Sequence, residues 1–98
     1  MLFAVLFTDK PGHGALRQTH LQAHIDWVAQ HRHTVLVAGS LRDEPDQVPR
    51  GALWVVDAPS KAAVYALMQT DPFHVCGLRE RVEVLHWSKA LPEHQVLV

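Results

Sequence analysis

The sequence lacks the features that mark disulfide-rich, membrane or nucleic-acid-binding proteins. It has a single cysteine, Cys76, so no internal disulfide framework can form. No apolar run approaches the roughly eighteen residues that a membrane-spanning helix needs. Nine Lys and Arg stand against ten Asp and Glu, and no basic cluster occurs. We therefore expect neither nucleic acid nor a membrane as a partner.

The apolar start MLFAVLF also lacks the features of a targeting segment. It has no positively charged leading region, and it ends after seven residues at Thr8. We interpret it as a strand, and we expect a cytoplasmic protein.

The length of the chain favours one domain. Ninety-eight residues suffice for one hydrophobic core, since separate domains usually need about 100 residues each. We expect a single domain over 1–98, with its core in 1–90 and a tail over 91–98. Such a short chain buries only about 60–65% of its unfolded surface, so covering an apolar face with a second subunit would be favourable.

Apolar spacing predicts two main helices. From Leu16 to Arg32 the period is helical, with Leu21, Ile25 and Val28 forming an apolar stripe that we expect to face the core. The second helix follows an N-cap at Ser60 and runs to about Thr70, and one further short turn is expected within 71–78.

Four strands complete the pattern. They are predicted at 2–8, 34–40, 51–57 and 79–87, with the charged turn 42–50 closing a hairpin between the second and third. The order β-α-β-β-α-β is that of the ferredoxin-like α+β fold, a four-stranded antiparallel sheet with both helices on one face. The first and third strands offer apolar groups to both faces, so we expect a homodimer packed sheet to sheet, of the dimeric α/β-barrel type.

The first predicted helix carries an unusual polar row beside its apolar stripe. Arg17, His20, His24, Trp27 and His31 share one arc at the edge of the core. One hypothesis is a zinc site on His20 and His24, which are four residues apart. It needs a third ligand, for which Asp71, His74 and His86 are candidates at no diagnostic spacing. We therefore expect no bound metal and no other cofactor.

A second hypothesis is acid–base chemistry, in which a histidine exchanges a proton with a ligand and a carboxylate orients the ring. Asp71 is the best-placed carboxylate by type, on a connector that this fold brings towards the first helix. It is also the residue before Pro72, so the alternative is a turn or helix-capping role. His24 can likewise be a hydrogen-bonded residue at the edge of the core, and Arg17 either a carboxylate-binding group or a solvated one.

Several segments together resemble the YciI-like (YCII-related) family. They are the LR pair at 16–17 with His24 seven residues after the arginine, LVAGSL at 36–41, GALWVVDA at 51–58, DPF at 71–73, CGL at 76–78 and VEVLHW at 82–87. They occur in the family's order and at nearly its intervals, and they span positions 1 to about 90.

The resemblance implies a dimeric ferredoxin-like domain whose active site is a histidine–aspartate pair, here His24 and Asp71. We expect Arg17, His20 and Phe73 to contact a small-molecule substrate beside this pair. The family usually has a second basic residue and a proline shortly before the histidine, where this chain has Leu21 and Gln22. That departure weakens the expectation of an anionic substrate, unless His20 supplies a replacement donor.

Two functional hypotheses follow from these observations. The first is a cofactor-independent enzyme of lyase or isomerase type, in which His24 takes a proton from a small cyclic or carboxylated compound. The resemblance admits dehydrochlorination of a hydroxylated ring as one such reaction. The second is a dimer that binds a small ligand, or regulates through it, without turnover, because a fold does not determine a function.

Overall fold

Four strands form one antiparallel sheet in the computed structural model, which describes residues 1–98. In chain order they are β1 (Leu2–Asp9), β2 (Val35–Leu41), β3 (Gly51–Asp57) and β4 (Arg79–His86). Their order across the sheet is β2-β3-β1-β4, so β1 lies between β3 and β4. With helices α1 (Gly14–Gln30), α2 (Lys61–Met68) and α3 (Pro72–Val75), this is the predicted ferredoxin-like α+β fold.

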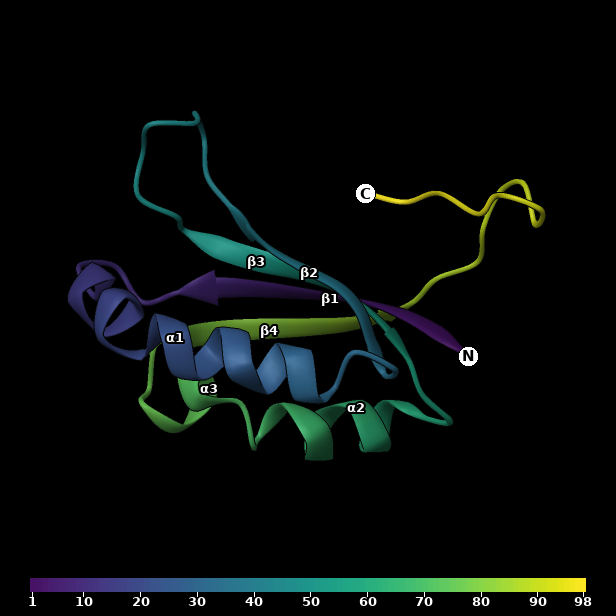
Figure 1. The fold of residues 1–98 in the computed structure, drawn as a ribbon, viewed down its shortest axis with the longest axis horizontal. Helices are drawn as coiled ribbons and strands as arrows, with labels where there is room; N and C mark the ends of the chain where they lie inside the picture. Colours follow the sequence, from purple (N-terminus) through teal and green to yellow (C-terminus); the bar gives the residue numbers. More distant parts are fainter.

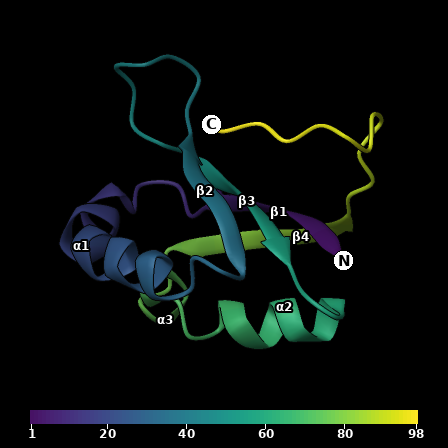
Figure 2. The same cartoon turned by 45° about the vertical axis from the view of Figure 1, so that its right-hand side comes forward.

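The helices cover one face of the sheet. Figures 1 and 2 show α1, α2 and α3 on the same side, with the C-terminal tail on the other. The core between the layers is apolar and aromatic, and its largest members are Phe3, Phe7, Trp27 and Trp54. None of the helices is long and apolar enough to cross a membrane.

The second face of the sheet is apolar and only partly covered. Along β1 the odd positions are buried under the helices, whereas the even positions are half-buried on the opposite face. Ala4 pairs there with Val55 of β3 and Leu85 of β4, so an apolar row crosses three strands. This arrangement agrees with the two-sided strands expected from the sequence.

The buried face of α1 differs from the predicted one. The apolar residues Leu21 and Ile25 are 42% and 48% exposed, whereas Arg17 and Trp27 are 8% and 6% exposed. The prediction that Leu21, Ile25 and Val28 face the core was therefore wrong for the first two residues. Trp27 reaches the core because it packs on Trp54, with ring centroids 5.3 Å apart, and donates its indole N–H to Thr70 Oγ1 at 2.9 Å.

Candidate functional site

The histidine and aspartate singled out from the sequence are in direct contact. His24 Nδ1 lies 2.7 Å from Asp71 Oδ1, across 47 positions of the chain. The Asp71 side chain is fully buried, and that of His24 is 13% exposed. A contact this short to a carboxylate oxygen requires a proton on Nδ1, which leaves Nε2 as the acceptor nitrogen of the neutral ring.

The start of α3 fixes the position of Asp71. The residue has an extended backbone, with ψ at 129°, as expected before Pro72. Its Oδ1 accepts the backbone N–H of Phe73 at 3.1 Å, so Asp71 is the N-cap of α3. The two roles considered for Asp71 are therefore compatible, because one oxygen caps the helix and contacts His24.

Aromatic rings surround the imidazole. The Phe73 ring stacks on His24 with centroids 4.1 Å apart and planes 14° from parallel. Trp54 and Trp27 lie further away, at 6.3 and 6.4 Å. His24 Nε2 makes no hydrogen bond, and it is not fully buried. It is therefore accessible from the cavity that His24 lines.

A buried network of charges lies beside this pair. Arg17 donates to Asp9 Oδ2 from Nε at 3.1 Å and from Nη2 at 2.7 Å. Arg79 Nη1 donates to the other oxygen of Asp9 at 2.9 Å. Burial lowers the pKa of the Arg79 guanidinium from its ordinary value, while the carboxylates of Asp9 and Asp71 act in the opposite direction.

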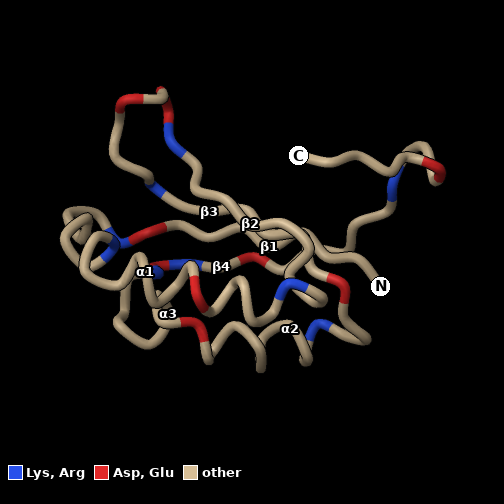
Figure 3. Tube along the Cα trace, in the orientation of Figure 1, with Lys and Arg blue, Asp and Glu red and all other residues tan.

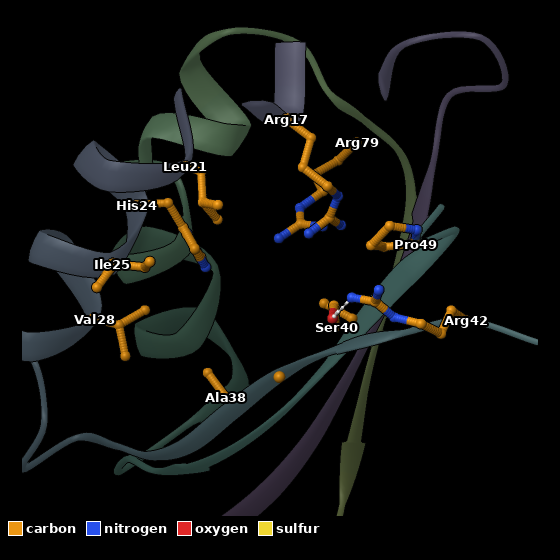
Figure 4. A pocket seen from close by; sticks show the side chains of 12 residues that line it. Arg17, Leu21, His24, Ile25, Val28, Ala38, Ser40, Arg42, Pro49 and Arg79 are labelled. Atoms are coloured by element: carbon orange, nitrogen blue, oxygen red, sulfur yellow. Dashed lines mark hydrogen bonds between the residues drawn. The ribbon is translucent and has the colours of Figure 1, made fainter. Parts of the chain in front are cut away.

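A cavity of about 360 Å³ adjoins His24 and both of these arginines. Figure 4 shows that α1 forms one side of the cavity, with His24, Leu21 and Ile25, while Ser40, Arg42 and Pro49 lie opposite. This volume is within the roughly 300–1,000 Å³ that is typical of small-molecule sites. The exposure of Leu21 and Ile25 is explained by this arrangement, since both form part of the wall.

Two of the expected substrate-binding residues are not on the cavity wall. Arg17 and His24 line it, but Phe73 is fully buried behind the imidazole and His20 is not part of the lining. His20 lies off this cavity in the structure, and its role as a replacement donor stays a prediction. Besides Arg17, the cavity wall contains two further basic residues, Arg42 and Arg79.

Sequence reasoning missed Arg42, Arg79 and Asp9. Asp9 and Arg79 are at the end of β1 and the start of β4, and only the antiparallel pairing of these strands brings them together. Charged residues at the ends of otherwise apolar strands were the available signal. Arg42 lies in the predicted charged turn, directly after β2, and its contribution to the cavity wall was not foreseen.

The arrangement offers no evident set of metal ligands. No group of three or more His, Cys, Asp or Glu side chains is placed to hold a metal ion. The zinc hypothesis for His20 and His24 thus has no third ligand of these types in the structure. The chemistry that the site can support is proton transfer at Nε2 beside cationic side chains.

Comparison with known proteins identifies related sequences and folds. The profile of the YCII-related domain matches residues 1–88. The structure of 5-chloro-2-hydroxyhydroquinone dehydrochlorinase from Burkholderia phenoliruptrix, in complex with 2,5-dihydroxybenzoquinone, matches with a TM-score of 0.80 and 25% identity, over 90% of this chain and 94% of that one. No curated protein matches the sequence significantly.

More distant structures share the fold alone. A candidate antibiotic biosynthesis monooxygenase from Bacteroides thetaiotaomicron has a TM-score of 0.58 and 16% identity, over 99% of this chain and 95% of that one. Another antibiotic biosynthesis monooxygenase has a TM-score of 0.51 and 18% identity, over 91% of this chain and all of the other. These similarities support the ferredoxin-like architecture.

Proposed function

The chain belongs to the YCII-related domain family, and on that basis we propose that it is a cofactor-independent acid–base enzyme of lyase or isomerase type. Its substrate is a small cyclic or carboxylated compound. The observation that carries the proposal is the 2.7 Å contact between His24 Nδ1 and the buried Asp71 carboxylate, with Nε2 open to a cavity.

The proposed mechanism uses the two ring nitrogens of His24 differently. Asp71 holds the proton on Nδ1, so that Nε2 accepts a proton from the bound ligand. The imidazolium formed in this step lies beside the Asp71 carboxylate, which stabilises its charge. In a lyase reaction the ligand then loses an anionic leaving group, and in an isomerisation the same proton returns at another position.

Packing around the imidazole supports this assignment. The ring of Phe73 covers one face of the His24 imidazole, and the contact with Asp71 limits the rotation of this ring within its side chain. A base held in one orientation needs little reorganisation to reach a proton-transfer geometry. Phe73 is therefore proposed as a positioning residue that supports His24 from behind, in place of the substrate contact expected from the sequence.

The related dehydrochlorinase suggests the first substrate to test. That protein acts on a chlorinated hydroxyhydroquinone, and loss of a proton and chloride from such a ring is a reaction that a single base can assist. The cavity of about 360 Å³ has room for one substituted ring. We therefore propose a hydroxylated ring as the substrate class.

The proposal is tested by chloride release from 5-chloro-2-hydroxyhydroquinone under anaerobic conditions, which prevent oxidation of the substrate by air. The parent protein should release chloride, and His24→Gln should reduce kcat by about a hundredfold or more. His20→Gln is the matched control, because His20 lies on the same helix but off the cavity wall. Equal rates in the two variants would contradict the role of His24.

The same assay separates the enzyme from a non-catalytic binder. If 2,5-dihydroxybenzoquinone binds beside His24 and no turnover of the chlorinated ring occurs, the ligand-binding dimer becomes the better description. Binding is followed by the imidazole resonances of His24, which respond to occupation of the cavity.

We also propose that the protein is a homodimer, packed through the open face of the sheet. The row of Val55, Ala4 and Leu85 presents apolar surface on that face, and Leu85 is 46% exposed. Burial of this surface against a second copy is favourable, since apolar area removed from water contributes about 25 cal/mol per Å². His24 belongs to α1 and Asp71 caps α3, and both helices lie on the covered face of the sheet, so each subunit carries its own pair.

A further inference from the structure

Three arginines line the cavity, and they differ in how their charges are balanced. Arg17 and Arg79 both bind Asp9 through short, buried ion pairs. Arg42 has neutral partners instead: it donates to Ser40 Oγ at 2.8 Å and to the carbonyl oxygen of Gln47 at 3.2 Å. No carboxylate lies within ion-pair distance of Arg42, since the salt bridges of the chain involve other groups.

The formal charges show what this difference means for a ligand. Arg17 and Arg79 carry two positive charges, and Asp9 and Asp71 carry two negative ones, so this buried group is neutral while the His24 ring is neutral. No acidic residue forms part of the cavity wall. The net positive charge of the empty cavity is therefore the charge of Arg42.

The loop that carries Arg42 contains Asp43, Glu44 and Asp46, and none of these carboxylates forms an ion pair with Arg42. Figure 3 shows both acidic and basic positions along the connection between β2 and β3. The nearest acidic neighbour in sequence, Asp43, is paired with Arg50 at 2.8 Å. Arg42 lies opposite α1 across the cavity, as Figure 4 shows, and its guanidinium has donors in addition to the two that are used.

The opposite part of the wall suits an uncharged ring. Leu21, Ile25 and Val28 of α1 face the cavity together with Ala38 and Ala52 of the sheet. A planar ring between these two surfaces covers the side chains of Leu21 and Ile25, which are otherwise exposed on this helix. Arg42 and His24 lie on opposite sides of the cavity in Figure 4, so a ring bound between them presents one end to each.

We propose that Arg42 binds an anionic substituent of the ligand, so that the preferred substrate is a hydroxylated ring that carries one carboxylate. This inference rests on the proposed function, because it assigns the part of the substrate that does not react. Arg42 orients the ring by a charge-assisted hydrogen bond, and His24 exchanges the proton at the other end. The charge of the bound carboxylate is balanced by Arg42, whose own partners are neutral.

The test compares two probes of nearly the same shape, one with an anionic carboxylate and one with a neutral amide in its place. We choose 2,5-dihydroxybenzoate and 2,5-dihydroxybenzamide, with affinities measured by calorimetry and site occupation checked on the His24 resonances. The parent protein should bind the carboxylate about tenfold more tightly than the amide, as a charge-assisted hydrogen bond implies. In Arg42→Gln this preference should fall to within about twofold.

Arg32→Gln is the matched control, since Arg32 is exposed, its side chain donates only to the carbonyl oxygen of Ala29, and it does not line the cavity. It should keep the preference of the parent. The inference is overturned if Arg42→Gln retains the preference, if both variants lose it equally, or if the parent does not bind the carboxylate more tightly than the amide. The inference is also overturned if the parent protein binds neither probe.

The outcome is independent of the test of the proposed function. Chloride release is measured on a ring without a carboxylate, so the comparison of His24→Gln with His20→Gln stands whatever Arg42 does. Conversely, probe selectivity at Arg42 can be present in a protein that shows no turnover.

Discussion

Arg79 and Asp71 face each other across 3.9 Å at the bottom of the site, from Nη2 to Oδ2, and neither atom has a hydrogen-bond partner. Both side chains are at least 95% buried. Arg79 also binds Asp9, so its single charge lies between two carboxylates, one of which contacts His24. In the proposed mechanism Arg79 is therefore a positioning residue, which acts on the imidazole through Asp71.

Replacing Arg79 should strongly destabilise the fold. Arg79→Gln removes the cation between Asp9 and Asp71, and an uncompensated buried charge costs about 3–5 kcal/mol. We expect the free energy of unfolding, measured by urea denaturation, to fall by about this amount. Arg50→Gln breaks an exposed ion pair with Asp43 and should change stability by at most about 1 kcal/mol. Similar losses in the two variants would contradict this account of the network.

Asp71→Asn should separate the helix cap from control of the imidazole. An asparagine oxygen still accepts the N–H of Phe73, so α3 keeps its cap, but the amide is neutral and gives less support to a proton on Nδ1. We expect the ¹⁵N shifts of His24 to show a smaller population of the Nδ1–H tautomer. Asp71→Ala loses both functions and should cost a further 1 kcal/mol or so in stability. An unchanged tautomer in Asp71→Asn would show that the contact does not orient the ring.

Gly51 should tolerate no side chain. A Cβ built on Gly51 lies 2.0 Å from the carbonyl oxygen of Phe7 on the neighbouring strand, and this oxygen is backbone that cannot rotate away. Gly51→Ala is therefore expected to lower the free energy of unfolding by about 2–3 kcal/mol through overpacking. Gly39→Ala is the matched control on β2, where a Cβ meets nothing within 4 Å. Thermal denaturation compares the stabilities of the two variants. Equal stabilities would contradict the prediction and would show that β1 and β3 can separate slightly to make room for the methyl group.

A charge on the open face of the sheet should prevent self-association. Val55→Arg places a guanidinium in the apolar row shared with Ala4, and burial of an unpaired charge between two sheets is costly. Sedimentation velocity should show a dimer for the parent and a monomer for the variant. Tyr65→Arg introduces the same side chain at an exposed position of α2, on the other side of the molecule, and should leave the dimer intact. A parent protein that sediments as a monomer would reject the proposed dimer.

Much of the architecture could be predicted because it depends on local patterns. The switch between helical and strand spacing located all four strands and the two longer helices, with α1 beginning two residues before the predicted start at Leu16. Ser60 was identified as an N-cap from its residue type, and its hydroxyl accepts the N–H of Ala63 at 3.1 Å. Such signals involve residues only a few positions apart.

The inward face of α1 could not be predicted by the same reasoning. Hydrophobicity alone favoured Leu21 and Ile25, yet the helix buries Arg17 and Trp27. Arg17 is buried because Asp9 offers it a charged partner, and that partner lies on a strand outside the helix. A helical period shows which residues share a face, and the partners available in the fold decide which face turns inward.

By itself the sequence determined the order of strands and helices, the two-sided apolar strands, and the residue types for proton transfer at His24 and Asp71. The tertiary structure alone decided that these two side chains meet, that Arg79 joins the network, and that Arg42 lines the cavity. The physical reason is distance along the chain. Helix and strand patterns arise between neighbours, whereas the contacts of this site join residues from opposite ends of the chain, and only the pairing of β1 with β4 and the packing of α1 on α3 bring them together.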